Sequence, residues 1–170
     1  MFSEEEIIKE CIKGNRKAEK HLYTKYNGLF FAICLRYTQS REEAEDVLIT
    51  GFTSIFESLP IYKKQGSFEG WMKRIIINTA VNHYRTNKKH LSNIDIEEID
   101  TINEISQKSY QDINVKDILN QIQMMPEGYK QVFNLFAIEG YKHTEIAEML
   151  HIAESTSKSQ YAKAKKWLQR

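Results

Sequence analysis

Apolar residues recur at spacings of three and four along most of the chain, which is the period of helices that bury one face. The third of the predicted helices has the clearest ends, because Ser40 and Glu43 form a capping-box pair and Pro60 cannot continue a helix. The pattern therefore predicts a small helical bundle in the first ninety residues, with helices at about 4–12, 17–37, 41–59 and 66–89.

A second apolar pattern begins after residue 117 and is interrupted at Pro126. It continues into two short helices that meet at a corner near His151 and Ile152. The small side chain of Ala147 lets these two helices cross closely, as a helix-turn-helix requires. The same pattern also fits an ordinary three-helix bundle that ends in a basic helix. The inner face of the last helix is predicted to hold Tyr161, Ala164 and Leu168.

Residues 90–117 have no sustained period and are rich in Asn, Ser, Gln and acidic side chains. Such a composition buries little apolar surface, so we interpret this segment as a linker that is partly disordered in the free protein. The sequence thus predicts an all-α protein with two small helical domains, at 1–89 and 118–170, joined by an acidic linker.

The net charge of +1 is unevenly spread along the chain. Residues 61–90 carry seven Lys or Arg against one Glu, and residues 154–170 carry five against one. Between them, residues 91–127 carry two Lys and eight acidic residues. The near-neutral total hides two basic blocks, and nucleic acid is the commonest polyanion that such blocks bind.

Cys11 and Cys34 both lie in apolar helical patterns, so we expect no disulfide and a reducing, cytoplasmic compartment. No signal-peptide pattern occurs and no window approaches the roughly eighteen apolar residues of a membrane span, so no membrane insertion is expected. The histidines lack partners at metal-ligand spacing, and no phosphate loop or nucleophile motif is present. The sequence accordingly predicts no enzyme, no catalytic residues, no cofactor, no metal and no small-molecule substrate.

The predicted helix at 66–89 carries a polar strip that is roughly 80° wide at about 100° per residue. Its cations can meet phosphates, its indole can stack on a base and its amides can bond base edges. A solvated helix face with a half-buried tryptophan fits the same pattern, but the basic surroundings favour nucleic acid. The strip holds Trp71, Arg74, Asn78, Asn82 and Arg85, and the apolar face is expected to hold Phe68, Met72, Ile75, Ile76 and Thr79.

Two other helices have outward faces with candidate functions. The last helix, from about Ser155, presents small polar groups for base edges beside lysines for phosphates, as a recognition helix does. These residues are Ser155, Ser159, Ala162, Lys163 and Lys166. The helix at 41–59 presents an acidic face, which fits either a solvated surface or a docking face for a basic partner. This face holds Glu42, Glu45, Asp46, Thr50, Thr53 and Glu57.

Four stretches resemble, in order, the successive conserved regions of the extracytoplasmic-function (ECF) sigma factors. These are small two-domain members of the sigma-70 family that direct bacterial RNA polymerase to promoters. The resemblance covers nearly the whole chain and implies a sigma region 2-like domain followed by a sigma region 4-like helix-turn-helix. The stretches are LYTKYNGLFFAICLRY at 22–37, EEAEDVLITGF at 42–52, FEGWMKRIIINTAVNHYR at 68–85 and MPEGYKQVFNLFAIEGYKHTEIAEML at 125–150.

The resemblance also implies which residues meet which partner. For reading and melting the promoter −10 element it implies Lys63, Lys64, Trp71, Arg74, Asn78, Asn82 and Arg85. For reading the −35 element it implies Ser155, Thr156, Lys158, Ser159, Lys163 and Lys166. For binding the coiled coil of the largest subunit of core RNA polymerase it implies Glu45, Asp46, Phe52 and Thr53.

Further partners follow from the same resemblance. Family members also contact the flap region of the polymerase, pass their linker through its interior towards the RNA exit path, and are commonly held inactive by an anti-sigma factor. The expected partners are therefore core RNA polymerase, promoter DNA and an anti-sigma factor.

The chain departs from the family pattern at three positions. Ile49 and Thr50 stand where a Gln and an acid are usual, which removes an amide and a charge and predicts weaker binding to the polymerase. Ser157 stands at an inner position of the recognition helix where Val is usual. A buried hydroxyl gives up about 1 kcal/mol of burial energy or more, so a loosely packed second domain is expected until DNA or polymerase binds.

Two other functions remain open on the sequence. A free-standing helix-turn-helix regulator of transcription would explain residues 141–170 but would leave the Trp71 strip and the acidic linker without a role. A degenerate sigma-like module that docks on other proteins without opening DNA is supported only by Ile49, Thr50 and Ser157.

Overall fold

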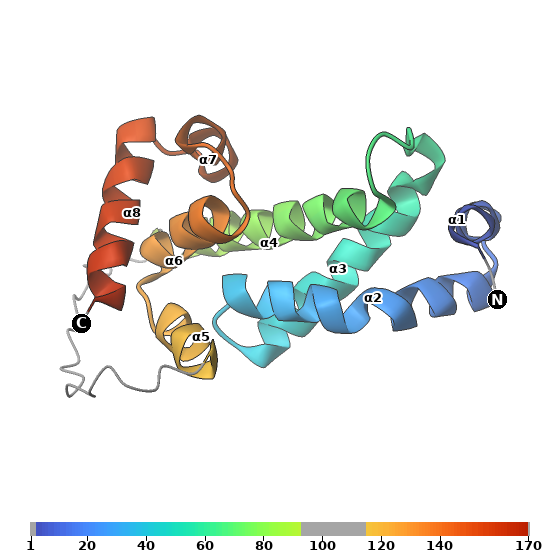
Figure 1. Cartoon of the computed structure of the whole chain (residues 1–170), viewed down its shortest axis with the longest axis horizontal. Coiled ribbons are helices and arrows are strands. Elements are labelled where there is room, and N and C mark those ends of the chain that lie inside the picture. The colour runs from blue at the N-terminus through green and yellow to red at the C-terminus, as the bar shows by residue number, and fades with distance from the viewer. Residues whose placement is uncertain (1–2, 93–114, 170) are drawn as a thin grey trace. The chain divides into compact units, whose positions relative to one another are not determined.

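A computed structural model describes residues 3–92 and 115–169, and these residues form helices without strands (Figure 1). A 3₁₀ turn, η1 (Leu59–Ile61), follows the third helix, and a π-helical turn, η2 (Asn134–Ile138), follows the sixth. The all-α prediction is therefore confirmed. The α-helices are α1 (Glu4–Ile12), α2 (Arg16–Tyr37), α3 (Arg41–Ser58), α4 (Phe68–Ser92), α5 (Val115–Gln123), α6 (Glu127–Phe133), α7 (His143–Leu150) and α8 (Glu154–Leu168).

The chain divides into two compact units, Met1–His83 and Tyr84–Arg170, and α4 runs from the first into the second. The predicted linker is shorter than expected at both ends, since α4 continues to Ser92 and α5 begins at Val115. The remainder of that prediction, residues 93–114, lies outside the described residues.

Side-chain caps set the helix ends of the first unit. Ser3 and Glu6 form a capping box on α1, and the Asn15 side chain accepts a hydrogen bond from the Lys17 N–H at the start of α2. The Ser40 hydroxyl accepts from the Glu43 N–H at 3.1 Å, which confirms the predicted start of α3. Each bond satisfies a backbone donor that a helix start leaves unpaired.

The predicted fourth helix begins two residues later than expected. Gly66 has a φ of +82°, a left-handed conformation that lets the chain turn before the helix. Ser67 then caps α4, because its hydroxyl accepts a hydrogen bond from the Gly70 N–H at 3.0 Å. A turn signal and a cap signal lie side by side here, and the cap defines the helix start.

The buried face of α4 is wider than predicted. Ile75 and Thr79, expected on that face, are only half-buried, because the face is centred on Met72, Ile76 and Ala80. At about 100° per residue, this centre lies roughly opposite the polar strip. The buried side chains are Phe68, Met72, Ile76, Ile77, Ala80 and Val81.

Helices α3 and α4 approach closely at Gly51. A β-carbon added at Gly51 would lie 2.5 Å from Ile76 Cδ1 and 3.7 Å from Ile76 Cα. Ile76 is fully buried, so its side chain has little room to move. The absence of a side chain at Gly51 therefore lets α4 present its buried face to α3.

The second unit packs α8 against α5, α6 and α7. The corner between α7 and α8 is made by His151 in a left-handed conformation, with φ 54° and ψ 47°. The Ile152 N–H donates to the Ala147 carbonyl at 3.0 Å, which closes the end of α7. This corner lies where the sequence predicts it. Buried Ile122, Met125 and Ala164 form a core with half-buried Tyr129, Phe133, Trp167 and Leu168 around it.

The predicted inner face of α8 is only partly right. Ala164 is buried and so is Ser157, which the family resemblance also places inside, but Tyr161 and Leu168 are only half-buried. Tyr161 instead packs with its ring centroid 4.5 Å from that of Phe136, which the π-helical turn carries. Aromatic contacts at the edge of this unit therefore supplement its small apolar core.

Candidate nucleic-acid interface

The polar strip of α4 lies on the surface of the first unit. Arg74, Asn78 and Asn82 are exposed and Trp71 is half-buried, on the side of α4 away from the core. This arrangement would present a guanidinium and two amides to a nucleic-acid strand that lies along the helix. The strip has the geometry to bind a nucleic-acid backbone and base edges together.

An aromatic platform stands at the start of this strip. The Tyr62 ring centroid lies 4.6 Å from that of Trp71 and 5.3 Å from that of Phe68. The Tyr62 hydroxyl lies 3.5 Å from the Gly66 carbonyl, at the outer limit of a hydrogen bond. Because Phe68 is buried, the pair Tyr62 and Trp71 is anchored to the core while both rings stay partly open to solvent. Such rings can stack on an unpaired base.

The sequence-based prediction missed Tyr62. The signal that could have found it is an aromatic residue in an otherwise basic loop, IYKKQGS at 61–67, close to the start of the polar strip. Hydrophobic periodicity does not detect such a residue, because it lies outside any helix and reaches Trp71 only through the fold of the loop.

The basic loop presents Lys63 and Lys64, both exposed. Lys64 has a φ of 54°, in the left-handed region that non-glycine residues seldom adopt. Its ammonium group lies 2.9 Å from Glu5 Oε1 in α1. This hydrogen bond is the main cause that holds the pKa of Glu5 below its usual value, so Glu5 is ionised at neutral pH.

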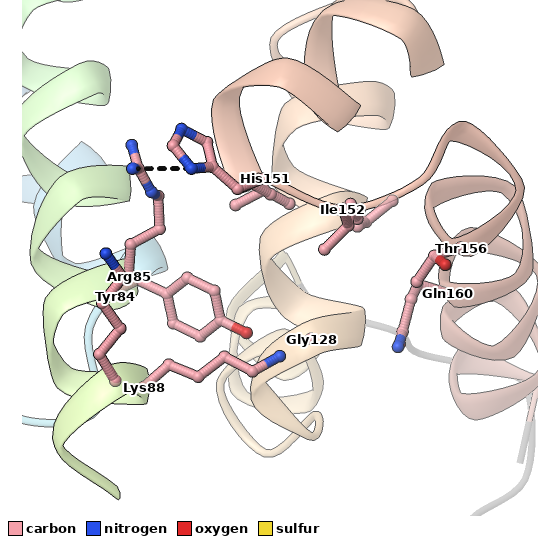
Figure 2. Close-up of a pocket in the computed structure, with 11 residues that line it drawn as sticks. Tyr84, Arg85, Lys88, Gly128, His151, Ile152, Thr156 and Gln160 are labelled. Carbon is pink, nitrogen blue, oxygen red and sulfur yellow. Dashed lines mark hydrogen bonds between the residues drawn. The ribbon is translucent and has the colours of Figure 1, made fainter. Parts of the chain in front are cut away.

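Arg85 is separated from the other strip residues by the unit boundary, since it lies beyond His83. Its Nη2 lies 3.2 Å from His151 Nδ1 within the second unit. Both residues line a hollow of about 250 Å³, shown in Figure 2 with Lys88, Thr156 and Gln160. The residues that line this hollow include Arg85, Lys88 and Lys89 but no carboxylate, beside apolar side chains such as Leu150.

The residues predicted to read the −35 element all lie on α8, and most of them are exposed. Ser155, Lys158 and Ser159 are exposed, as are Lys163 and Lys166. The sixth predicted residue of this set, Thr156, is half-buried.

Several of these groups already have intramolecular partners. The Ser159 hydroxyl donates to the Thr156 carbonyl at 3.0 Å, and Lys158 pairs with Glu154 at 2.6 Å. That hydrogen bond from Lys158 is the main cause that lowers the pKa of Glu154. Exposed ion pairs of this kind add little stability, so a phosphate can replace the carboxylate.

Ser157 has a partner that the sequence did not indicate. Its hydroxyl oxygen lies 2.9 Å from Nδ1 of His143, at the first position of α7. The imidazole also stacks on Phe136, with ring centroids 4.2 Å apart. The expected cost of burying this hydroxyl is therefore offset by a hydrogen bond that joins the two helices of the helix-turn-helix.

The acidic face of α3 is exposed at Glu45, Asp46 and Thr53. Phe52 differs from these residues, because it is only 3% exposed and packs between Phe30 and Phe56. The structure therefore places Phe52 beneath this face, in a position to support it.

Two further features modify this face. Glu45 pairs with Arg41 at 2.9 Å, so its charge is partly compensated. Ile49 is 59% exposed, and the exposed Thr53 donates its hydroxyl hydrogen to the Ile49 carbonyl at 3.0 Å. The face therefore combines acidic groups with an apolar side chain that is largely exposed.

The two cysteines are structural. Burial raises the pKa of Cys11 to about 11 and that of Cys34 to about 12, so both thiols stay protonated at neutral pH. Among the described residues, no group of three His, Cys, Asp or Glu is placed to hold a metal ion. Within 3–92 and 115–169, no helix has the length and apolar character to cross a membrane.

Both halves of the chain match models of known protein families. Residues 22–90 match the model of sigma-70 region 2, and residues 116–168 match the model of sigma-70 region 4. The chain is 22% identical over 179 residues to the ECF RNA polymerase sigma-E factor of Haemophilus influenzae, a match that covers 99% of this chain and 94% of that protein. It is also 22% identical over 173 residues to the RNA polymerase sigma-H factor of Pseudomonas aeruginosa, with 95% and 90% covered.

A solved structure shares the fold. The sigma factor RpoE from Bartonella quintana, crystallised with the anti-sigma factor NepR, matches with a TM-score of 0.53 at 17% identity, over 88% of this chain and 93% of that chain. The region 2 match covers the α4 strip and its platform, and the region 4 match covers the helix-turn-helix. The chain therefore belongs to the sigma-70 family of RNA polymerase sigma factors, in its ECF subfamily.

Proposed function

We propose that this protein binds core RNA polymerase in the cytoplasm and directs it to promoters, with the α4 strip contacting the −10 element as a single strand. The observation that carries this proposal is the platform of Tyr62 and Trp71 beside an exposed guanidinium and two exposed amides, and these three polar groups lie opposite the buried face of α4. Stacking on aromatic rings holds unpaired bases, and amides and cations add contacts to base edges and phosphates.

The second DNA contact in this proposal is α8. Its exposed hydroxyls and lysines suit the major groove and the adjoining phosphates of the −35 element. The hydrogen bond between Ser157 and His143 holds α8 against α7, so the recognition helix is positioned by the domain before DNA binds.

The α3 face is the proposed contact with the coiled coil of the largest polymerase subunit, and the second unit is the proposed contact with the flap. Asp46 and Glu45, whose charge Arg41 partly compensates, suit a basic partner surface, while Ile49 adds apolar area. An anti-sigma factor that covers these faces would keep the protein inactive. In this proposal the protein contributes binding and positioning, and the polymerase performs the chemistry.

The experiment that tests this function is titration of the purified chain into bacterial core RNA polymerase. We expect a complex, and we expect it to transcribe from a pool of templates with randomised −35 and −10 elements, so that sequencing the transcribed templates returns a defined promoter. A double variant with Ile49→Gln and Thr50→Glu is expected to bind the polymerase more tightly, since it restores the amide and the charge.

Asn78→Ala separates DNA reading from polymerase binding. Asn78 is exposed and lies outside the core, so its loss is expected to lower transcription about tenfold while the affinity for core polymerase stays the same. Lys20→Gln, at an exposed position of α2, is the control for an unrelated surface change. If neither the natural chain nor the double variant at positions 49 and 50 forms a polymerase complex, the proposal is refuted and a free-standing DNA-binding regulator is favoured.

A further inference from the structure

Helix α1 brings a carboxylate to the basic loop that precedes the α4 strip. Glu5 and Lys64 are far apart in sequence, yet Oε1 and Nζ are 2.9 Å apart. Lys64 reaches this position from a left-handed backbone conformation, at a φ of 54°. The start of the same loop is held by the aromatic platform, because Tyr62 packs on Trp71 and Phe68. The loop thus contributes Tyr62 to the platform at its start, and Lys64 in its middle forms an ion pair with α1.

The position of α1 is set by packing. Ile7, Ile8 and Cys11 are buried, and α1 packs against both α2 and η1. The first turn of α1 contains three consecutive glutamates, which have different roles. Glu6 accepts a hydrogen bond from the Ser3 N–H at 2.8 Å in the capping box, and Glu4 makes no ion pair within the described part of the chain. Of these three glutamates, Glu5 is the one that pairs with the loop.

The pair between Glu5 and Lys64 is reversible. The side chains are 68% and 56% exposed, so water and salt reach both groups. Because Glu5 is ionised at neutral pH, it competes with a phosphate for Lys64 and repels a strand that approaches the loop. A nucleic-acid strand must displace this carboxylate before Lys64 can contact its backbone.

We propose that Glu5 is a specificity-determining residue that suppresses binding of nucleic-acid single strands held only by their phosphates. A strand that also places a base on the Tyr62 and Trp71 platform gains enough contacts to release Lys64 from Glu5. A strand without such a base gains only the phosphate contact and loses the ion pair. This inference rests on the proposed function of the loop and strip in single-strand binding, and it adds a residue of α1 that lies outside both family-model matches.

The test measures binding of the full-length chain to two fluorescent single strands by anisotropy, over a range of potassium chloride concentrations: an abasic strand, which offers phosphates without bases, and an oligothymidine of the same length. For the abasic strand, Glu5→Gln is expected to tighten binding about two- to fivefold at low salt, the range for loss of one exposed ion pair, and to steepen the slope of log K against log salt by about 0.7, because Lys64 then neutralises one more phosphate of a single strand. For the oligothymidine both changes should be smaller, because its bases on the platform already release Lys64, and equal changes for the two strands would overturn the inference. Glu4→Gln, the same charge change one residue away, is the matched control and should have a much smaller effect.

A second background separates the pair from a general charge effect. In a Lys64→Gln protein, Glu5→Gln and Glu4→Gln should behave alike, because the group that Glu5 blocks is absent. Equal effects of Glu5→Gln and Glu4→Gln with Lys64 present would overturn the inference while leaving the proposed function intact, provided that Lys64→Gln weakens binding. If none of these proteins binds either strand, the proposed single-strand contact and the inference both fail.

Discussion

At the scale of single residues, Gly51 determines how closely α3 and α4 pack. Glycine costs helix stability compared with alanine, so its presence inside α3 requires a compensating contact. The missing side chain leaves room for the δ-methyl group of buried Ile76. The polar strip lies on the far side of the same helix, so this contact also supports the proposed DNA-binding surface.

We predict that Gly51→Ala destabilises the protein by about 1–3 kcal/mol, because the added methyl group overlaps Ile76 Cδ1 in a packed core. Ile76→Val removes that terminal methyl group and should cost about 1 kcal/mol by itself. In the double variant the overlap is gone and the helical preference of alanine remains, so the two changes should be less than additive in urea unfolding. Additive losses would show that another contact explains the glycine.

Ser157 shows how one residue can reverse an expectation. A buried hydroxyl in place of valine suggests loose packing when only burial is considered. The bond to His143 satisfies this hydroxyl across the helix-turn-helix corner. The cost expected from sequence holds only for an unpaired group, and the partner lies fourteen residues earlier in the chain.

At the scale of elements, α6 contains a buried cation. The Lys130 side chain is 1% exposed and pairs with Glu127 at 2.6 Å, one turn earlier in the same helix. The ammonium group also lies 3.5 Å from Gln123 Oε1 at the end of α5. This polar cluster joins α5 to α6 on either side of Pro126, where the apolar pattern is interrupted.

We predict that Glu127→Gln lowers the free energy of unfolding by about 1–3 kcal/mol, because it leaves the buried ammonium group without its carboxylate. Lys130→Met keeps the apolar stem and removes the charge, so its effect should stay within about 1 kcal/mol. Urea unfolding of the full chain measures both. A larger loss for Lys130→Met than for Glu127→Gln would contradict this account.

At the scale of the whole molecule, the net charge of +1 conceals two basic blocks, and cations from these blocks lie in both units: Lys63, Lys64 and Arg74 in the first, and the lysines of α8 in the second. Each unit therefore offers its own surface for a polyanion. A protein with two such surfaces can contact two separated stretches of one DNA molecule.

We predict that promoter binding by the polymerase complex is strongly salt-dependent and that α8 contributes part of the slope. Lys166→Gln removes one exposed cation from the outward face of α8 and should reduce the slope of log K against log salt by about 0.9 on duplex DNA. Lys20→Gln, on α2, should leave the slope unchanged. Competition assays at several potassium chloride concentrations measure the difference in slope. Equal slopes for Lys166→Gln and the natural chain would show that Lys166 does not contact the DNA.

The sequence by itself determined the helices, their order and the family, because helix periodicity, caps and turn residues are local properties. It also located the α4 strip, since residues three and four apart on one helix share a face whatever the surrounding fold. Tertiary structure alone decided which neighbours these residues have. Tyr62 beside Trp71, Glu5 on Lys64, His143 on Ser157 and the burial of Phe52 are contacts between separate segments, and no local pattern encodes a contact that forms only when those segments pack.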